Sequence, residues 1–324
     1  MDAETGAVLA LQILALCSIV AALLAYLMRQ SRNATDEYES RSKRHVLVTS
    51  CDTCVGLQIA LALSEAGYKV FAGLLNPAGA TPAVQILRAI ELERTKGKEP
   101  LEDGNTQKPE VCARGQIVPL ELDPTREDSL RACLDAVRAK LPAGEDGLWA
   151  VVHTGGLALP GVIERQASSA WESMLRHNLV APLRTARVFI PLLRAKRGRI
   201  ILFGDSEDSY STKAGAGLVA FSASRKAVEG AAEALKSELH SSGIDVVLLK
   251  PPPVNPLVLY AAPTLKTTSG ETGKKSTEGI WTAPLSSYSI NASLIPALTS
   301  SCPLNTYDMA IKASIFCQKR SLIK

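Results

Sequence analysis

Two cysteines stand three positions apart in the turn that follows the first apolar segment of the main body of the chain. In Cys51-Asp-Thr-Cys54 both thiols would lie near the start of a helix, where the partial positive charge of the helix end can lower a thiol pKa and support redox exchange. The same turn, Thr49 to Gly56, is also placed like a phosphate-binding loop, whose backbone amides hold negative charge. Both interpretations start from a strand, a turn and a helix.

Strands and helices alternate along the body of the chain. Short apolar segments predict six strands, and a helix is predicted over 56–66, closed by Gly67. Strands separated by helices imply right-handed crossovers and a parallel sheet. The predicted fold is therefore α/β, a doubly wound parallel sheet (Rossmann-like) with helices on both faces. We expect the strands at 45–49, 69–75, 116–122, 148–152, 199–203 and 244–249, and a surface insertion at 91–115.

Composition excludes several functional classes. The chain has 324 residues, of which 46% are hydrophobic and 21% charged, as in globular proteins. Its net charge of +4 (36 Lys and Arg against 32 Asp and Glu) is slight and dispersed, so we predict no nucleic-acid partner. The seven scattered cysteines match neither a disulfide-stapled secreted module nor the paired spacing of zinc ligands, and no metal site is predicted.

The N-terminal segment predicts a membrane anchor. Residues 6–28 contain no charged side chain, and a helix of that length can cross a hydrocarbon core of roughly 30 Å. Basic residues follow the segment, which places the main domain in the cytosol by the positive-inside rule. We therefore expect an anchor at 1–29, a polar linker at 30–44, the Rossmann-like domain at 45–256 and a C-terminal substrate-loop and tail segment at 257–324.

Four motifs together resemble those of the short-chain dehydrogenase/reductase family, over roughly residues 44–255 with a further match in the tail. Thr49-Ser-Cys-Asp-Thr-Cys-Val-Gly56 is similar to the TGxxxGxG loop, most closely to the TGCDxGFG form of the retinol, 17β-hydroxysteroid and 3-hydroxybutyrate dehydrogenase branch. Leu120-Glu-Leu-Asp123 and Arg176-His-Asn178 resemble two further family segments. The tail, Ala297-Leu-Thr-Ser-Ser-Cys-Pro-Leu-Asn-Thr-Tyr307, is similar to the ALTSxxPRTRY stretch of the retinol and hydroxysteroid enzymes.

The resemblance implies a nicotinamide cofactor, NAD or NADP. Ser50 and Cys54 replace two glycines of the phosphate loop, and Gly73-Leu-Leu-Asn76 carries neither the acid typical of NAD binding nor the base typical of NADP binding. The family's NNAG motif becomes His153-Thr-Gly-Gly156, which is either a tight turn or a nucleotide contact. The cofactor-binding positions implied by the resemblance are Thr49, Ser50, Cys54, Gly56, Asp123, Thr154 and Gly155.

The catalytic positions implied by the resemblance are mostly changed. The family uses a Tyr as general acid/base, a Lys four residues later and a Ser that orients the substrate oxygen. These positions fall on Phe221, Arg225 and Asp205, whereas Asn178 is retained and either takes part in catalysis or pins a helix bend. The PGxxxT turn that binds the nicotinamide amide becomes Pro251-Pro-Pro-Val-Asn-Pro256, and Tyr210 is either a displaced proton donor or a loop tyrosine.

Two functions follow from this pattern. The favoured one is a membrane-anchored protein of steroid, retinoid or other lipid metabolism, in which ordinary Tyr/Lys catalysis is impaired or lost and a binding or scaffold role remains. The alternative is a divergent NAD(P)-dependent oxidoreductase that acts on a steroid or other lipid alcohol or ketone with a displaced proton donor. We expect a lipid-like ligand, the endoplasmic reticulum membrane, and a homo- or hetero-oligomer through helices near 172–194 and 217–241, whose apolar stripes fit core packing equally well.

Overall fold

A computed structural model of the chain describes residues 20, 42–96, 115–142, 144, 147–206, 217–251, 254–265, 283 and 285. The chain divides into two compact units, Met1–Lys43 and Arg44–Lys324. The expected anchor at 1–29 lies, except for Val20, outside the described residues, as do Tyr210 and the tail motif at 297–307. Within the described ranges, no helix is both long enough and apolar enough to span a membrane.

Six parallel strands form one sheet in the order β3-β2-β1-β4-β5-β6. This order confirms the predicted doubly wound arrangement, and each predicted strand lies within two residues of its observed bounds. Buried, nearly continuous apolar segments form these strands because both faces of the sheet are covered. The strands are β1 His45–Val48, β2 Lys69–Leu74, β3 Ile117–Glu121, β4 Ala150–His153, β5 Arg199–Phe203 and β6 Asp245–Leu249.

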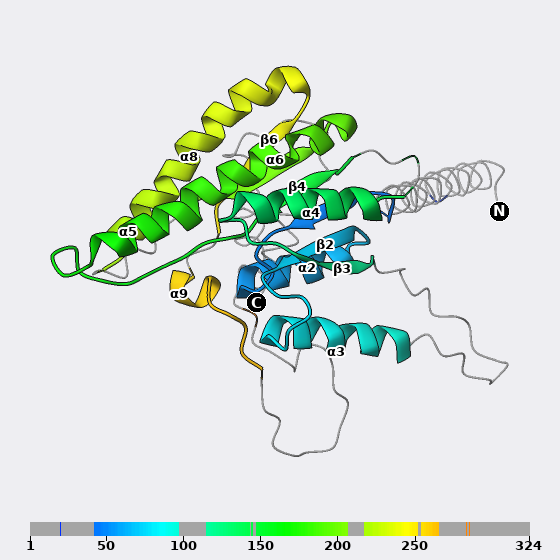
Figure 1. Cartoon of the computed structure of the whole chain (residues 1–324), viewed down its shortest axis with the longest axis horizontal. Helices are drawn as coiled ribbons and strands as arrows, with labels where there is room; N and C mark the ends of the chain where they lie inside the picture. Colours follow the sequence, from blue (N-terminus) through cyan, green and yellow to red (C-terminus); the bar gives the residue numbers. More distant parts are fainter. Residues whose placement is uncertain are drawn as a thin grey trace, which may run out of the picture. The chain divides into compact units, whose positions relative to one another are not determined.

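Helices cover both faces of the sheet (Figure 1). Helices α2, α3 and α9 pack on one face, and α4, α6 and α8 on the other. A π-helical turn, η1, joins α5 to α6, and a short 3-10 turn, η2, follows α8. The helices are α2 Cys54–Glu65, α3 Pro82–Lys96, α4 Glu127–Lys140, α5 Ser168–Leu175, η1 Arg176–Val180, α6 Ala181–Lys196, α8 Val219–Leu239, η2 His240–Ser242 and α9 Pro256–Leu259.

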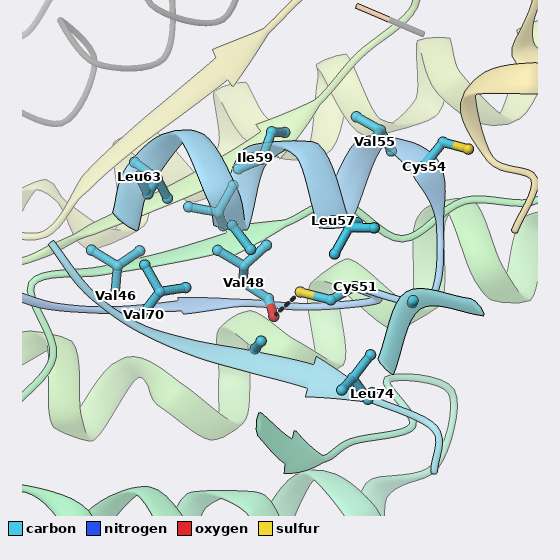
Figure 2. Close-up of a cluster of buried hydrophobic side chains, with 14 of the residues drawn as sticks. Val46, Val48, Cys51, Cys54, Val55, Leu57, Ile59, Leu63, Val70 and Leu74 are labelled. Carbon is cyan, nitrogen blue, oxygen red and sulfur yellow. Dashed lines mark hydrogen bonds between the residues drawn. The ribbon is translucent and has the colours of Figure 1, made fainter. Parts of the chain in front are cut away.

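Strand β1 supplies side chains to two separate hydrophobic cores. Val46 and Val48 point toward α2, as Figure 2 shows, whereas Leu47 packs with the helices of the opposite face. This alternation follows from the two-residue period of a strand. Each fully buried aliphatic side chain of this kind stabilises the fold by about 1.5–3 kcal/mol. The central strand is therefore held rigidly beneath the turn that follows it.

The first part of the predicted surface insertion at 91–115 is helical in the structure and belongs to α3. Residues 91–96 continue α3 to Lys96, because Glu, Leu, Arg and Lys are good helix formers and extend the preceding apolar pattern. Residues 97–114 lie outside the described residues. The next described residue, Gly115, donates a hydrogen bond from its backbone amide to the carbonyl oxygen of Ser64 at 2.7 Å.

The carboxyl ends of β1 and β4 mark the topological switch point of the sheet. These neighbouring strands lead into crossovers that run in opposite directions, toward β2 and toward β5. Ligands of open α/β sheets bind in the crevice that this divergence creates. The turns after β1 and β4 therefore define where the functional site must be sought.

Replacing Ser50 by glycine should stabilise the turn after β1. Ser50 has φ 51° and Arg197 has φ 48°, a left-handed backbone that costs a residue with a Cβ atom about 1–2 kcal/mol. Glycine removes this cost but loses about 0.5–1 kcal/mol more entropy on folding. We expect Ser50→Gly, like Arg197→Gly, to raise the free energy of unfolding by up to about 1 kcal/mol in urea denaturation. Ser50→Ala, which keeps the Cβ atom, should give no gain, and an equal gain from it would contradict the explanation.

Candidate functional site at the switch point

The turn after β1 forms a tight loop that leads into α2. Thr53 caps this helix, because its hydroxyl oxygen accepts a hydrogen bond from the amide of Gly56 at 3.2 Å and its own hydroxyl donates to the carbonyl oxygen of Ser50 at 2.8 Å. A Cβ atom on Gly56 would collide with that carbonyl oxygen and lie 2.8 Å from the Thr154 hydroxyl. Gly56 is thus the residue that lets α2 approach the turns after β1 and β4.

The backbone amide of Cys54 already has a partner within the chain. It donates a 2.8 Å hydrogen bond to the carbonyl oxygen of Ala261, just beyond α9. In a phosphate loop, an amide at the start of this helix would be directed at an anionic ligand. Ala261 therefore takes up one of the donors that the loop would offer to a pyrophosphate.

Figure 2 shows Cys51 beneath α2 and Cys54 at the first position of that helix, and both residues are buried. The Cys51 thiol donates to the carbonyl oxygen of Val48 at 3.4 Å, and burial, together with the charge of Asp52, raises its pKa. Burial also raises the pKa of the Cys54 thiol. Both cysteines are free. Because the thiolate is the reactive form, this environment favours packing over redox exchange for the CxxC segment.

A buried network joins the turns after β1 and β4. The Thr49 hydroxyl accepts from the Thr154 amide at 3.1 Å and lies 3.3 Å from Nδ1 of His153, while the Thr154 hydroxyl donates to the carbonyl oxygen of Thr49. If the Thr49 hydroxyl hydrogen is assigned to Nδ1, the proton of the neutral ring sits on Nε2. Burial and the nearby charge of Arg225 lower the pKa of His153 to about 3, so the imidazole is neutral at physiological pH.

Arg225 is buried at the position where the family places its lysine. Its side chain is 1% exposed, with Nη1 donating to the carbonyl oxygen of Phe203 at 3.2 Å and Nη2 to that of Gly155 at 3.3 Å. Among the described residues, Nε has no hydrogen-bond partner. Burial lowers the pKa of Arg225, whereas Tyr260 and Asp205 oppose that shift. The guanidinium is thus held by carbonyl oxygens at the ends of β4 and β5.

Tyr260 lies against Arg225 and was not identified from the sequence. Its ring centroid is 4.4 Å from the guanidinium carbon and 6.0 Å from the Phe221 ring centroid. Its hydroxyl is buried and, within the described ranges, has no hydrogen-bond partner. Burial raises the pKa of this phenol, and the Arg225 charge opposes the shift. The Asn-Pro pair before Leu257-Val-Leu-Tyr260 is a helix-start signal that could have revealed α9, but no motif marks the tyrosine itself.

Asn178 holds the helix bend at η1. Its side-chain oxygen accepts from the amide of Leu157 at 2.7 Å, and its nitrogen donates to the Leu157 carbonyl oxygen at 2.9 Å and to the Ser224 hydroxyl at 2.8 Å. The residue is fully buried inside the π-helical turn. Of the two roles considered for Asn178, these contacts support pinning of the bend and the loop that follows β4.

The two candidate carboxylates serve different turns. Asp205, after β5, is buried and accepts from the Ser222 hydroxyl at 3.0 Å, on the same helix as Phe221 and Arg225. Asp123, after β3, accepts from the amide and hydroxyl of Thr125 at 2.9 and 2.6 Å. Asp205 therefore belongs to the cluster around Arg225, whereas Asp123 closes the turn that leads into α4.

The residues around the switch point do not fit a bound dinucleotide in this conformation. The Cys54 amide is bonded to Ala261, and the Tyr260 ring packs over Arg225. A Cβ atom on Gly156 would meet the Tyr260 ring at 2.6 Å, so the ring also lies directly against the turn after β4. These are the places where a dinucleotide would cross from the helix end to the second half of the sheet.

The fold and the switch-point turns define a protein of the dinucleotide-binding, doubly wound type. A family model described as short chain dehydrogenase matches residues 95–261, just over half of the chain. The chain belongs to the short-chain dehydrogenase family. Two solved structures share the fold: a metagenomic short-chain oxidoreductase in complex with NADP (22% identity, TM-score 0.51, covering 65% of this chain and 83% of that one) and gox2181 (20%, 0.52, 66% and 74%).

Distant relatives come from several dehydrogenase groups. The chain is 24% identical to a rat mitochondrial D-beta-hydroxybutyrate dehydrogenase (68% of this chain, 57% of the relative) and 26% identical to rat retinol dehydrogenase 7 (64% and 56%). A 3beta-hydroxysteroid dehydrogenase of Caenorhabditis elegans is 24% identical (66% and 50%). The chain thus spans about half the length of these curated relatives.

His153 should make the stability of the fold sensitive to acid. Its pKa is about 3 in the folded protein and about 6.5 in the unfolded chain, so only the unfolded chain gains a proton at this position as the pH falls between these values. Stability present above pH 6.5 is therefore lost through that window, by up to about 1.4 kcal/mol per pH unit. We expect His153→Asn to flatten the fall of unfolding free energy between about pH 7 and about pH 4, measured in urea. Parallel curves for the two proteins would contradict this.

Proposed function

We propose that this chain is a membrane-anchored member of the short-chain dehydrogenase family that has lost ordinary Tyr/Lys catalysis and serves as a binding or scaffold protein in steroid, retinoid or other lipid metabolism. The main support for the proposal is that neither Phe221 nor Arg225 can take part in proton transfer. Phe221 has no ionisable proton, and Arg225 is buried and bonded to two carbonyl oxygens. General acid/base catalysis needs a titratable group within reach of substrate, and neither residue supplies one.

The lipid-like ligand and the membrane location belong to the same proposal. Relatives named as retinol, hydroxysteroid and hydroxybutyrate dehydrogenases support an alcohol or ketone of this class as ligand. The uncharged run at 6–28, followed by basic residues, supports an anchor at 1–29, a linker at 30–44 and a cytosolic domain at 45–256 with its tail at 257–324, on the endoplasmic reticulum. In the scaffold role, the protein forms an oligomer with a second copy of itself or with an active relative.

A displaced proton donor is the second candidate function. Tyr260 favours it, because its phenol is buried beside a guanidinium and its hydroxyl has no partner among the described residues. The Tyr260 ring also packs against the cluster that contains Met174, Leu218 and Phe221, so its phenol lies close to the position of the lost one. In that case the chain is a divergent NAD(P)-dependent oxidoreductase, and Tyr260 supplies the proton that Phe221 cannot.

Turnover measurements on the full-length protein in detergent separate the two functions. We expect no oxidation of retinol, a 3β-hydroxysteroid or 3-hydroxybutyrate, and no reduction of the matching carbonyls, with NAD, NADH, NADP or NADPH. The double variant Phe221→Tyr with Arg225→Lys, which restores a phenol and an ammonium group, should give detectable turnover where the wild type gives none, if the cofactor cleft admits a dinucleotide at saturating concentration. Turnover by the wild type would overturn the proposed loss of catalysis.

The variant Tyr260→Phe decides the alternative. It keeps the ring and its packing on Arg225 but removes the only proton that the phenol can give. If the wild type turns over a substrate and Tyr260→Phe does not, while cofactor affinity is unchanged, the displaced donor is supported. Equal turnover by the two proteins would exclude Tyr260 as that donor.

A further inference from the structure

Helix α9 and the two residues after it form a short segment, residues 256–261, which we name the plug. Asn255 caps its start, because the side-chain oxygen accepts from the Leu257 amide at 3.0 Å. Leu259 is 2% exposed and packs in the core cluster with α2, whereas Val258, on the same helix, is 49% exposed. The helix of the plug therefore has one buried and one exposed face. It lies on the α2 side of the sheet (Figure 1), and Leu259 packs into the core there.

Two neighbouring residues at the C-terminal end of the plug contact the two sides of the switch point. Ala261 accepts the hydrogen bond from the Cys54 amide, in the turn after β1. Tyr260 lies over Arg225 and against Gly156, in the turn after β4. Neighbouring residues of one segment thus bridge the crevice between β1 and β4, the place where doubly wound sheets receive their ligands.

A dinucleotide and the plug need the same groups. A pyrophosphate in this crevice would be held by amides at the start of α2, and the Cys54 amide is engaged by Ala261. A cofactor that continues past Gly156 would meet the Tyr260 ring. Because one amide hydrogen and one volume cannot serve both, binding of a dinucleotide and docking of the plug exclude each other.

We propose that the plug is an intramolecular competitor of dinucleotides, and that the cleft opens to a nicotinamide dinucleotide only when residues 256–261 leave it. The inference rests on the proposed function and adds regulation of the same site. The charge of Arg225 supports it, because the guanidinium has the Tyr260 ring as a partner when the plug is docked and gains an anionic partner when a dinucleotide replaces it. When a dinucleotide displaces the plug, Arg225 therefore exchanges the Tyr260 ring for an anionic group as the partner of its charge.

Removing the Tyr260 ring should increase dinucleotide affinity. The apparent dissociation constant of a ligand equals its intrinsic constant divided by the fraction of molecules in the open state. Loss of the stacking on Arg225 raises that fraction, so we expect the full-length Tyr260→Ala protein to bind NADH or NADPH about tenfold more tightly than the wild type, by calorimetry in detergent. Tyr260→Phe, which keeps the ring, and Val258→Ala, on the exposed side of α9, should bind like the wild type.

A covalent lock tests the same idea without removing a packed side chain. The Cys54 amide bonds the Ala261 carbonyl oxygen at 2.8 Å, so the two residues are direct neighbours, and Ala261→Cys places a second cysteine beside Cys54. Where mild oxidation links the two thiols, the disulfide holds the plug in its docked position. The oxidised variant should lose dinucleotide binding, and a reductant should restore it. The cysteine pair loses two thiol protons and two electrons to the added oxidant.

The outcomes keep this inference distinct from the proposed function. Equal affinities of the wild type and Tyr260→Ala for all four dinucleotides, with both proteins folded by circular dichroism, would contradict the proposal that the plug competes with dinucleotides. Dinucleotide binding by the oxidised, disulfide-linked Ala261→Cys variant would do the same. Tighter binding by Tyr260→Ala without any turnover would support both proposals, whereas turnover by the wild type would overturn only the loss of catalysis.

Discussion

The burial of one cationic side chain constrains the whole of the site. A guanidinium removed from water costs several kcal/mol unless its charge and its donors find partners. Arg225 finds them in the carbonyl oxygens of Phe203 and Gly155 and in the ring of Tyr260, and Asp205 acts on it through space. The ends of β4 and β5, helix α8 and the segment after β6 are all arranged around this group.

The buried charge of Arg225 explains why His153 is neutral and why an apolar side chain is suited to position 221. His153 is held neutral by burial and by the same positive charge, so the interior carries one cation at this point and not two. Phe221 offers an apolar surface where a phenol hydroxyl would need a partner, and it packs with Met174 and Leu218. The interior at this position thus accommodates a planar cation with several donors, which an ammonium group could not replace with the same contacts.

Much of the fold could be predicted from the sequence, because apolar segments separated by helical patterns have few stable arrangements other than a doubly wound parallel sheet. The positions of Phe221 and Arg225 followed from motif spacing within one helix, which tertiary structure does not alter. Tyr260 and the Ala261 carbonyl group could not be found in this way. Their roles depend on contacts with α8 and with the start of α2, which are distant in the sequence, and no local pattern records such contacts.

Gly156 is the point at which the turn after β4 meets two other parts of the site. A Cβ atom at this position would collide with Nη2 of Arg225, so the guanidinium keeps its present place only beside a glycine and must shift for any other residue. The Tyr260 ring would lie 2.6 Å from the same Cβ atom, so a larger residue at 156 would displace both side chains. A single methyl group added in the turn after β4 would thus disturb residues of both α8 and the plug, although it lies in neither.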